Sequence, residues 1–449
     1  KQRNLSIIGK IQLIKTFCIS KFIFITNMKN TPANIIQEAN TLIYNFIWNG
    51  PDKVKRLTMI SDIESGGLKM PDLESIVQTQ KIIWVKRFSD ENYHPWKEFL
   101  RSSLKQSGSY NILNRRLSNS VIDMLQISDF NKEMIKTWNE KQVLPNSIEE
   151  IGNQYLWHNE NVKTPNGKSI HYPRLLKMGI HFIKDLLENG RIMSMACIDS
   201  KNITSVEMFE MKWVIKCILI YRKKLGFLNV EISTLNAYQY KKQKLAKLNT
   251  KVLYKQLVNQ KKEIATSEQF FEKLLCVNRL EMEYFYSIAF NASIYTKLRS
   301  FQYKMNHNII FTNEKLHKIG RTESPLCVFC NNHIETLVHL FVECNKVNVL
   351  WNQVTNALLS PYGVDSLTSK DILLGIVLNN RQNGIINHII LEAKYYIFVC
   401  KQEESPPLYH RLKNRLRITE KIEKMIAFKK RKLTEHEYKW HHLTNYLMA

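Results

Sequence analysis

The sequence lacks the short motifs that mark several large classes of enzyme. It contains no two consecutive aspartates, no glycine-rich phosphate loop and no His-Glu-x-x-His motif. A pair of aspartates can hold the catalytic Mg²⁺ of a polymerase, and the other two motifs bind nucleotides or a catalytic zinc ion. No nucleophile–base arrangement is evident either. We therefore expect this chain alone to be no enzyme, with no catalytic residue and no small-molecule substrate.

Long uncharged apolar runs are missing too. No stretch approaches the ~18–20 residues that a membrane-spanning helix needs, so we expect neither a transmembrane helix nor a membrane partner. Lys10 and Lys15 interrupt the apolar N-terminal stretch, which excludes a signal peptide. Because the sequence begins at Lys1 rather than Met, we expect it to be part of a longer protein.

Cysteine is scarce, with eight residues in a chain of 449. Five of them are scattered in apolar contexts, which is typical of reduced core residues in an intracellular protein of the cytoplasm or nucleus. These five are Cys18, Cys197, Cys217, Cys276 and Cys400.

Acidic residues are also few, since 40 Asp and Glu face 65 Lys and Arg and the net charge is +25. A charge of this sign and size favours a polyanionic partner, most commonly RNA or DNA. Solubility alone, or an AT-rich genome that favours Lys, Asn and Ile codons, would give a similar composition.

The remaining three cysteines form the strongest local motif. Cys327, Cys330, His339 and Cys344 have the spacing C-x2-C-x8-H-x4-C. Three thiolates and one imidazole suit four-coordinate zinc, and a site closed by four protein ligands is structural rather than catalytic. On a regular helix His339 and Cys344 would point in different directions, so we expect His339 near one helix end and Cys344 at the start of the next helix. Buried free cysteines beside a chance histidine are the alternative.

Apolar residues recur at helical spacing along most of the chain, which predicts a mainly α fold. In residues 5–25 the expected apolar face consists of Ile7, Ile8, Ile11, Ile14 and Cys18. Residues 32–48 should form a second helix, ended by Asn49-Gly50-Pro51. Its expected buried stripe is Ile35, Ile36, Ala39, Leu42, Ile43, Phe46 and Ile47.

Basic residues cluster in several places that we expect to contact nucleic acid. Residues 241–262 hold eight lysines and no acidic residue, and Leu245, Leu248, Val252 and Leu257 predict an amphipathic helix there. Residues 411–432 hold ten basic and two acidic residues, with Ile418, Ile422, Met425 and Ile426 on one apolar side. A solvated surface helix, or in the second case a nuclear-import run, is the alternative. The expected contacts are Lys53, Lys55, Arg56, Lys241, Lys242, Lys244, Lys297, Lys304, Lys429, Lys430, Arg431 and Lys432.

Several short motifs follow one another in a specific order in the N-terminal part: Leu5-Ser6, Gly9-Lys10, Lys15, Phe46 to Gly50, Lys53 to Arg56 and Gly66 to Leu73. Their order and spacing resemble the thumb region of LINE-class non-LTR retrotransposon reverse transcriptases. Residues 154–187 resemble the middle of the family's C-terminal half. The passage from Thr296 through the Cys/His motif to Trp351 is similar to its zinc-binding region. That family's Tyr-x-Asp-Asp signature is missing here.

The resemblance implies a thumb-like helical bundle followed by a helical region with a small zinc-stapled module. We expect a thumb-like domain in residues 1–100, a helical linker in 101–265, a zinc-binding domain in 266–360 and a basic helical tail in 361–449. The implied function is to hold template RNA or target DNA for an RNA-directed DNA polymerase whose remainder lies elsewhere, with zinc as a structural cofactor. The alternative is a zinc-stabilised helical scaffold for protein partners, derived from a decayed or co-opted retroelement.

Overall fold

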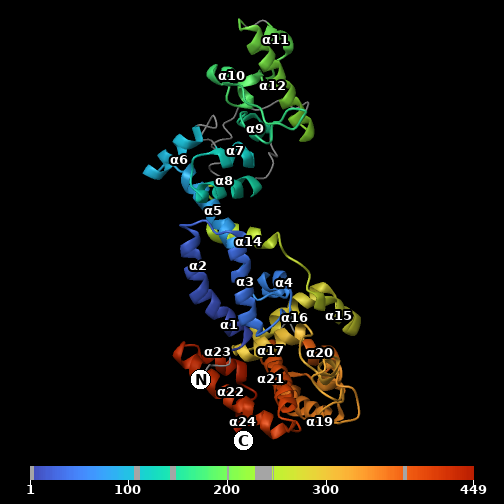
Figure 1. Ribbon diagram of the computed structural model, residues 1–449. Helices are drawn as coiled ribbons and strands as arrows, with labels where there is room; N and C mark the ends of the chain where they lie inside the picture. Colours follow the sequence, from blue (N-terminus) through green and yellow to red (C-terminus); the bar gives the residue numbers. More distant parts are fainter. Residues whose placement is uncertain are drawn as a thin grey trace. The chain divides into compact units, whose positions relative to one another are not determined.

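Helices make up most of the structure, a computed structural model that describes residues 5–105, 112–141, 148–199, 202–227, 245, 247–377 and 382–448 (Figure 1). Within these ranges the strands amount to one small antiparallel pair, β1 (Leu187–Glu188) and β2 (Arg191–Ile192). The predicted mainly α fold is confirmed. None of the described helices has the length and apolar character needed to cross a membrane.

The chain folds into two compact units, each built from separate stretches of sequence. Unit 1 contains residues up to Ile19, Glu38–Asp72 and everything from Val258 onward, and unit 2 contains Ser20–Gln37 and Leu73–Leu257. The four consecutive segments expected from the sequence remain a prediction.

The described residues of unit 2 form helices around three apolar clusters, the smallest of which gathers Ile82, Leu253 and Leu257. The largest cluster includes Trp157, whose indole Nε1 donates a hydrogen bond of 2.8 Å to the carbonyl of Ile180. The second gathers α5, α6 and α8 around residues such as Val85 and Leu104. The helical elements are α2 (Ile19–Thr26, which begins at the unit boundary), α5 (Leu73–Ser89), α6 (Pro95–Lys105), α7 (Asn119–Met124), α8 (Asp129–Lys141), α9 (Ile148–Gly152), α10 (Pro173–Lys177), η3 (Ile183–Leu186), α11 (Met195–Asp199), α12 (Ser205–Lys224) and α14 (Thr250–Asn259).

The predicted basic helix over residues 241–262 is described mainly as α14, and its buried side differs from the prediction. Leu253 and Leu257 are buried, whereas Val252 is exposed. Lys241, Lys242 and Lys244 lie outside the described residues.

Unit 1 begins with α1 (Ile7–Leu13), which continues into a π-helical turn, η1 (Ile14–Cys18). A π-helical turn contains an additional residue, so it rotates every later side chain around the axis. As a result Ile19 is buried and Cys18 is exposed. The expectation of a core cysteine at position 18 was therefore wrong, as it was for Cys276, which is exposed at the end of α15 (Thr266–Leu275).

The helix predicted from the second apolar stretch is α3 (Ala33–Trp48), but most of its expected stripe is not buried. Tyr44, Ile47 and Trp48 are buried, whereas Leu42 and Phe46 are exposed. Helical spacing identifies an apolar face but not whether another element covers it, which accounts for the error.

A tight glycine turn follows α4 (Arg56–Ile60) and η2 (Ile63–Ser65). Gly66 has a φ of 77° in the left-handed region, and a Cβ added to Gly67 would lie 2.0 Å from the carbonyl oxygen of Ser61. The carbonyl of Gly66 is hydrogen-bonded to Nε2 of His307 at 2.8 Å. The Gly-Gly sequence therefore allows this turn to close on itself and to pack against Tyr286 and His307.

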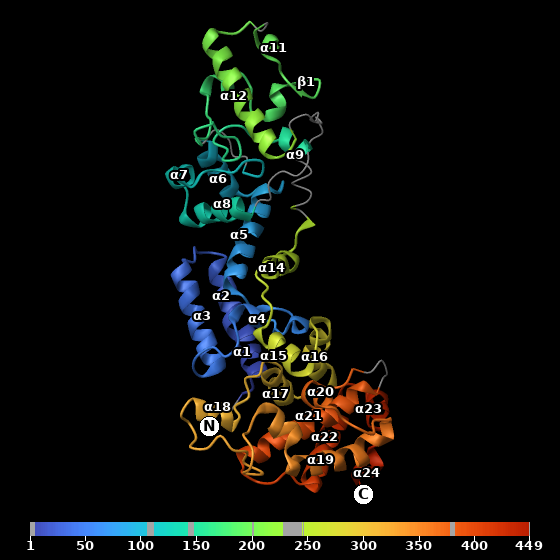
Figure 2. The same ribbon diagram turned by 90° about the vertical axis from the view of Figure 1, so that its right-hand side faces the viewer.

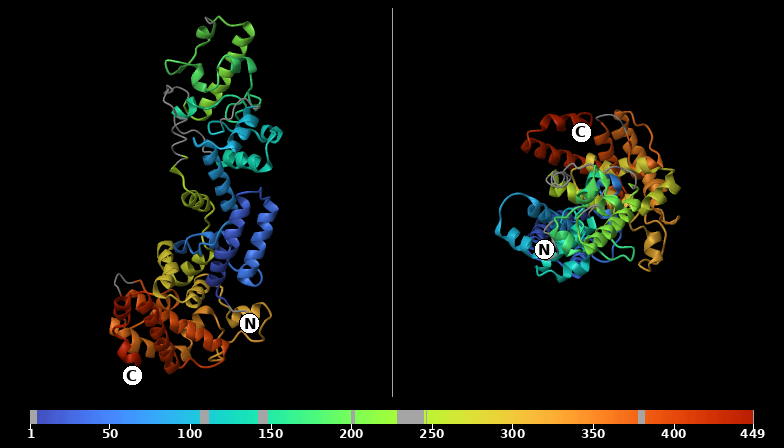
Figure 3. Two further views of the ribbon diagram at one scale, coloured as in Figure 1. Left: turned by 90° about the vertical axis from the view of Figure 1, so that its left-hand side faces the viewer. Right: turned by 90° about the horizontal axis from the view of Figure 1, so that it is seen from above.

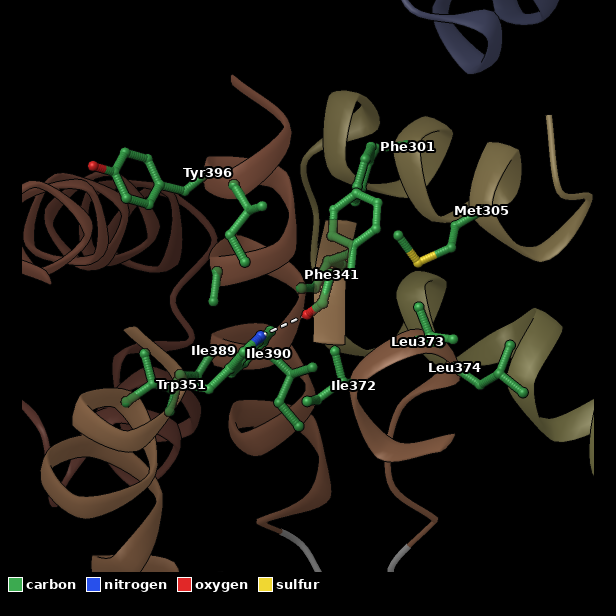
Figure 4. Close-up of a cluster of buried hydrophobic side chains, with 14 of the residues drawn as sticks. Phe301, Met305, Phe341, Trp351, Ile372, Leu373, Leu374, Ile389, Ile390 and Tyr396 are labelled. Carbon is green, nitrogen blue, oxygen red and sulfur yellow. Dashed lines mark hydrogen bonds between the residues drawn. The ribbon is translucent and has the colours of Figure 1, made fainter. Parts of the chain in front are cut away.

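The rest of unit 1 surrounds one large apolar core, part of which is shown in Figure 4. Phe301, Phe341 and Ile389 meet there, and Nε1 of Trp351 donates a 2.8 Å hydrogen bond to the carbonyl of Phe341. The surrounding helices are α15 (Thr266–Leu275), α16 (Arg279–Ala292), α17 (Thr296–Asn306), α18 (Asn313–Lys318), η4 (His339–Glu343), α19 (Asn345–Val354), η5 (Thr355–Leu359), η6 (Ser360–Tyr362), α20 (Ser369–Leu374), α21 (Asn383–Gln402), α22 (Tyr409–Lys429), α23 (Leu433–Trp440) and α24 (Thr444–Met448).

The C-terminal helices belong to the same core as the Cys/His motif. α22, α23 and α24 lie together (Figure 3), and α1 lies beside α17 (Figure 2). Leu412 and Leu416 of α22 are buried, as is Trp440 of α23. The tail of the chain is thus an integral part of unit 1.

The apolar side expected for α22 faces solvent. Ile418 and Met425 are 59% and 64% exposed, while the core-facing side contains Glu420 and Glu423. These carboxylates are tolerated because they have partners: Glu423 accepts hydrogen bonds from Nε1 of Trp440 and from the Lys439 ammonium.

Candidate metal centre

The four predicted zinc ligands come from three local elements that meet at one point. Cys327 and Cys330 lie on a turn in which the amide of Asn331 donates to the carbonyl of Cys327. His339 is the first residue of η4, and Cys344 is the N-cap of α19. Their ligand atoms all lie within 4.8 Å of one another. In the part of the chain that the structure describes, this is the one such group of His, Cys, Asp or Glu side chains.

The distances fit a tetrahedral zinc ion. Sγ of Cys327 lies 3.9 Å from Sγ of Cys344, and Sγ of Cys330 lies 3.4 Å from Nε2 of His339. With zinc bonds of about 2.3 Å to sulfur and 2.0–2.1 Å to nitrogen, tetrahedral ligand atoms are about 3.5–3.8 Å apart. The donor set therefore fits zinc, with Nε2 as the ligand atom of His339.

A π-helical turn brings the side chains of His339 and Cys344 to the same side, although on a regular α-helix residues five apart would point in different directions. The amide of Cys344 donates to the carbonyl of His339 at 2.9 Å, which is an i→i+5 bond. In such a turn residue i+5 follows residue i by one full turn, so both side chains are on the same side. The expectation that His339 is near a helix end and Cys344 opens the next helix agrees with this geometry. Glu335 and Thr336 precede the helical residues of the motif.

Electrostatics at the site favour the protonation states that a metal requires at Cys344 and His339, but not at Cys327. The hydrogen bond from the Cys327 thiol lowers the pKa of Cys344 to about 7, while the same contact raises the pKa of Cys327. Burial, followed by the neighbouring His333, lowers the pKa of His339. Thiolate and neutral imidazole are the forms that bind zinc. The His333 ring is stacked on that of His339 with 5.3 Å between the ring centroids, but the residue is exposed.

A buried carboxylate supports the first cysteine turn, and sequence reasoning missed its role. The side chain of Glu335 is inaccessible to solvent and pairs with Lys401 of α21. It also accepts hydrogen bonds from the amides of Val328 (3.1 Å) and Asn313 (2.8 Å). Glu335 therefore joins the metal-binding turn to α18 and α21. A glutamate next to apolar Ile334 and Leu337 was the available signal, but its partner is 66 residues away in sequence.

The described residues among the expected nucleic-acid contacts fall into three groups in the structure. Lys53, Lys297 and Lys304 line one cavity of unit 1. Lys55 instead pairs with Glu263 at 3.1 Å, and Arg56 pairs with Asp52 at 2.7 Å.

The basic run at the end of α22 is mostly exposed. Lys429 ends the helix and Lys430 is its C-cap, a position where cations interact favourably with the helix dipole. Arg431 has a φ of 56°, and Lys432 pairs with Glu435 at 2.8 Å. These contacts with the helix dipole and with Glu435 fit a structural role as well as they fit contact with nucleic acid.

Comparison with known proteins supports the zinc-binding interpretation of this region. A search of curated proteins finds no match for the chain. Residues 249–351, which contain all four candidate ligands, match the family model for zinc-binding in reverse transcriptase, so this part of the chain is similar to the zinc-binding region of reverse transcriptases.

Proposed function

We propose that this chain is the thumb-like and zinc-binding segment of a LINE-class reverse transcriptase, and that it holds RNA or DNA without polymerising it. The observation that carries the proposal is the Cys3His cluster within the region similar to the zinc-binding region of reverse transcriptases. The ordered N-terminal motifs support the thumb assignment, and the net charge of +25 supports a nucleic-acid partner.

In this proposal the zinc ion has a structural role. Cys327, Cys330, His339 and Cys344 would hold it and leave no open coordination position for water. The ion would staple the cysteine turn to η4 and α19. Cys327 and Cys344 are themselves part of the apolar core of unit 1, so the metal would stabilise the surface on which basic residues are displayed.

The proposal is tested by measuring metal content and nucleic-acid affinity on the same purified chain. We expect one zinc ion per chain at the single described cluster. Affinity for structured RNA and duplex DNA should fall steeply with salt, by a log–log slope of about 0.7–0.9 for each phosphate contact. Affinity that does not change with salt would contradict the electrostatic basis of binding. The Cys327→Ser variant is the matched control for metal content.

A second function has one observation in its favour. The exposed apolar residues Ile418, Met425 and Phe428 of α22 are typical of a surface that contacts a protein. A zinc-stabilised scaffold would contain zinc but would bind neither RNA nor DNA in the same assay.

A further inference from the structure

The cavity that gathers Lys53, Lys297 and Lys304 lies entirely within unit 1 and has a volume of about 810 Å³. α1, the end of α3, α17, α18 and the end of α21 form its walls. Val328, from the metal-binding cysteine turn, is part of the same wall. We call this cavity the basic pocket and define it by Lys53, Lys297, Lys304, Arg321, Phe311 and Val328.

Two further lysines of the cavity are already used by the fold. The Lys10 ammonium donates to the carbonyls of Phe46 (2.8 Å) and Ile47 (3.1 Å) at the end of α3. Lys401 pairs with the buried Glu335. These contacts are structural, so neither amine is available for a ligand without loss of a helix end or of the metal-binding turn.

The other four cations have no carboxylate partner among the described residues. No ion pair or side-chain hydrogen bond within the described ranges involves Lys297, Lys304 or Arg321. The Lys53 ammonium lies over the ring of Phe311, 4.6 Å from its centroid. Glu404 is the one acidic residue in the described lining of the cavity. The pocket thus concentrates positive charge without compensating it internally.

The environment of Lys304 shows the effect of this concentration. Its pKa is lowered, first by burial and then by the charges of Lys53 and Lys10. Like charges that crowd together in a partly buried site repel one another, and an anion placed between them removes that repulsion.

The size and chemistry of the pocket select among anions. A volume of about 810 Å³ is within the range of roughly 300–1,000 Å³ that encloses a small ligand or a short polymer segment, but it is too small for a double helix. Phe311, which is 42% exposed, adds an aromatic surface beside the charges. Lysines for phosphate and an aromatic ring for a base are the usual components of a single-strand site.

We propose that the basic pocket binds single-stranded nucleic acid, with its phosphates near Lys297 and Lys304 and a base against Phe311. This inference rests on the proposed nucleic-acid function and narrows it to one site and one form of nucleic acid. The bound strand would be flanked by the metal-binding cysteine turn.

The test compares oligo-dT, oligo-U and a blunt duplex of equal length by fluorescence anisotropy over a range of salt concentrations. The pocket variant is Lys297→Gln/Lys304→Gln, and the control Lys177→Gln/Lys273→Gln removes the same charge from exposed positions outside the pocket. We expect the pocket variant to bind single strands about tenfold more weakly, and its log–log salt slope to fall by about 1.4, which corresponds to two lost phosphate contacts. Duplex affinity should be unchanged, and so should both affinities of the control.

Phe311→Leu separates stacking from charge. It should weaken single-strand binding roughly tenfold and leave the salt slope intact, because stacking on an aromatic ring releases no counterions. Circular dichroism of every variant checks that the helices remain folded.

Each other outcome overturns a specific statement. An equal loss for duplex and single strand would refute the assignment to single strands. Unchanged binding in the pocket variant, with salt-sensitive binding by the parent chain, would refute the pocket while the proposed function stands. If the parent chain binds no nucleic acid, both the pocket assignment and the proposed nucleic-acid function are refuted.

Discussion

A buried amine in the core of unit 1 leads to a prediction about pH. Lys394 of α21 is fully buried among apolar side chains, and its ammonium donates to Oε1 of Gln302 (2.7 Å) and to the carbonyl of Leu373 (3.0 Å). No carboxylate contacts it among the described residues. Burial lowers its pKa to about 7. The folded protein therefore loses this proton near neutral pH, while the unfolded chain retains it to about pH 10.5.

The sign and size of the effect follow from proton linkage. Above pH 7 the unfolded state binds more protons at this position than the folded state, so the free energy of unfolding rises with pH. Between pH 7 and pH 9 these pKa values raise the free energy of unfolding by about 2 kcal/mol. Lys394→Met removes the titration and retains the length of the side chain, although it leaves Oε1 of Gln302 without its donor.

The prediction concerns the difference in the free energy of unfolding between the parent chain and Lys394→Met at each pH. The contributions of all other titrating groups cancel in this difference. Hydrogen exchange of peptides from α17 reports the local free energy of unfolding without requiring the two units to unfold together. The advantage of the parent chain over Lys394→Met should increase by about 2 kcal/mol from pH 7 to pH 9. Lys273→Met, at an exposed site, should show no such increase. An equal difference at both pH values would refute the argument that burial has shifted this pKa.

Three further predictions follow from the same unit. Cys344→Ser should abolish zinc binding and expose the amides of the surrounding core to exchange, because an apparent free energy of zinc binding of roughly 10–16 kcal/mol exceeds the stability of most domains. Equal protease resistance of the parent chain with and without a chelator would contradict this coupling of zinc binding to folding. Gly67→Ala should destabilise unit 1 by more than about 3 kcal/mol, since its Cβ would meet the Ser61 carbonyl at 2.0 Å, whereas Gly384→Ala, which meets nothing within 4 Å, should be nearly neutral in urea unfolding. Burial lowers the pKa of His388 to about 3, so as pH falls below about 6.5 the unfolded chain binds a proton at this position before the folded chain does. By pH 5 the free energy of unfolding of the parent chain should therefore fall by about 2 kcal/mol more than that of His388→Leu in the same exchange experiment.

The sequence was sufficient where the relevant contacts are local. The four candidate zinc ligands lie within eighteen residues, so their spacing alone indicated the donor set and placed a helix boundary between His339 and Cys344. Helical periodicity likewise predicted the mainly α fold, because it depends on residues three and four apart. Leu298, Phe301 and Met305 recur at helical spacing in α17, and all three are buried.

Tertiary structure decided everything that depends on which surfaces meet. Leu42 and Met425 belong to apolar faces that no described element covers, and Cys18 is turned outward by a π-helical residue that periodicity cannot detect. Ion pairs with Glu263 and Asp52 engage Lys55 and Arg56, while Lys53 joins Lys297 and Lys304 in one cavity across more than 240 residues of sequence. The sequence indicated the candidate metal ligands, since an ion selects neighbours at fixed short spacing. Only the fold decided which of the 65 basic residues converge, because charge alone carries no information about position.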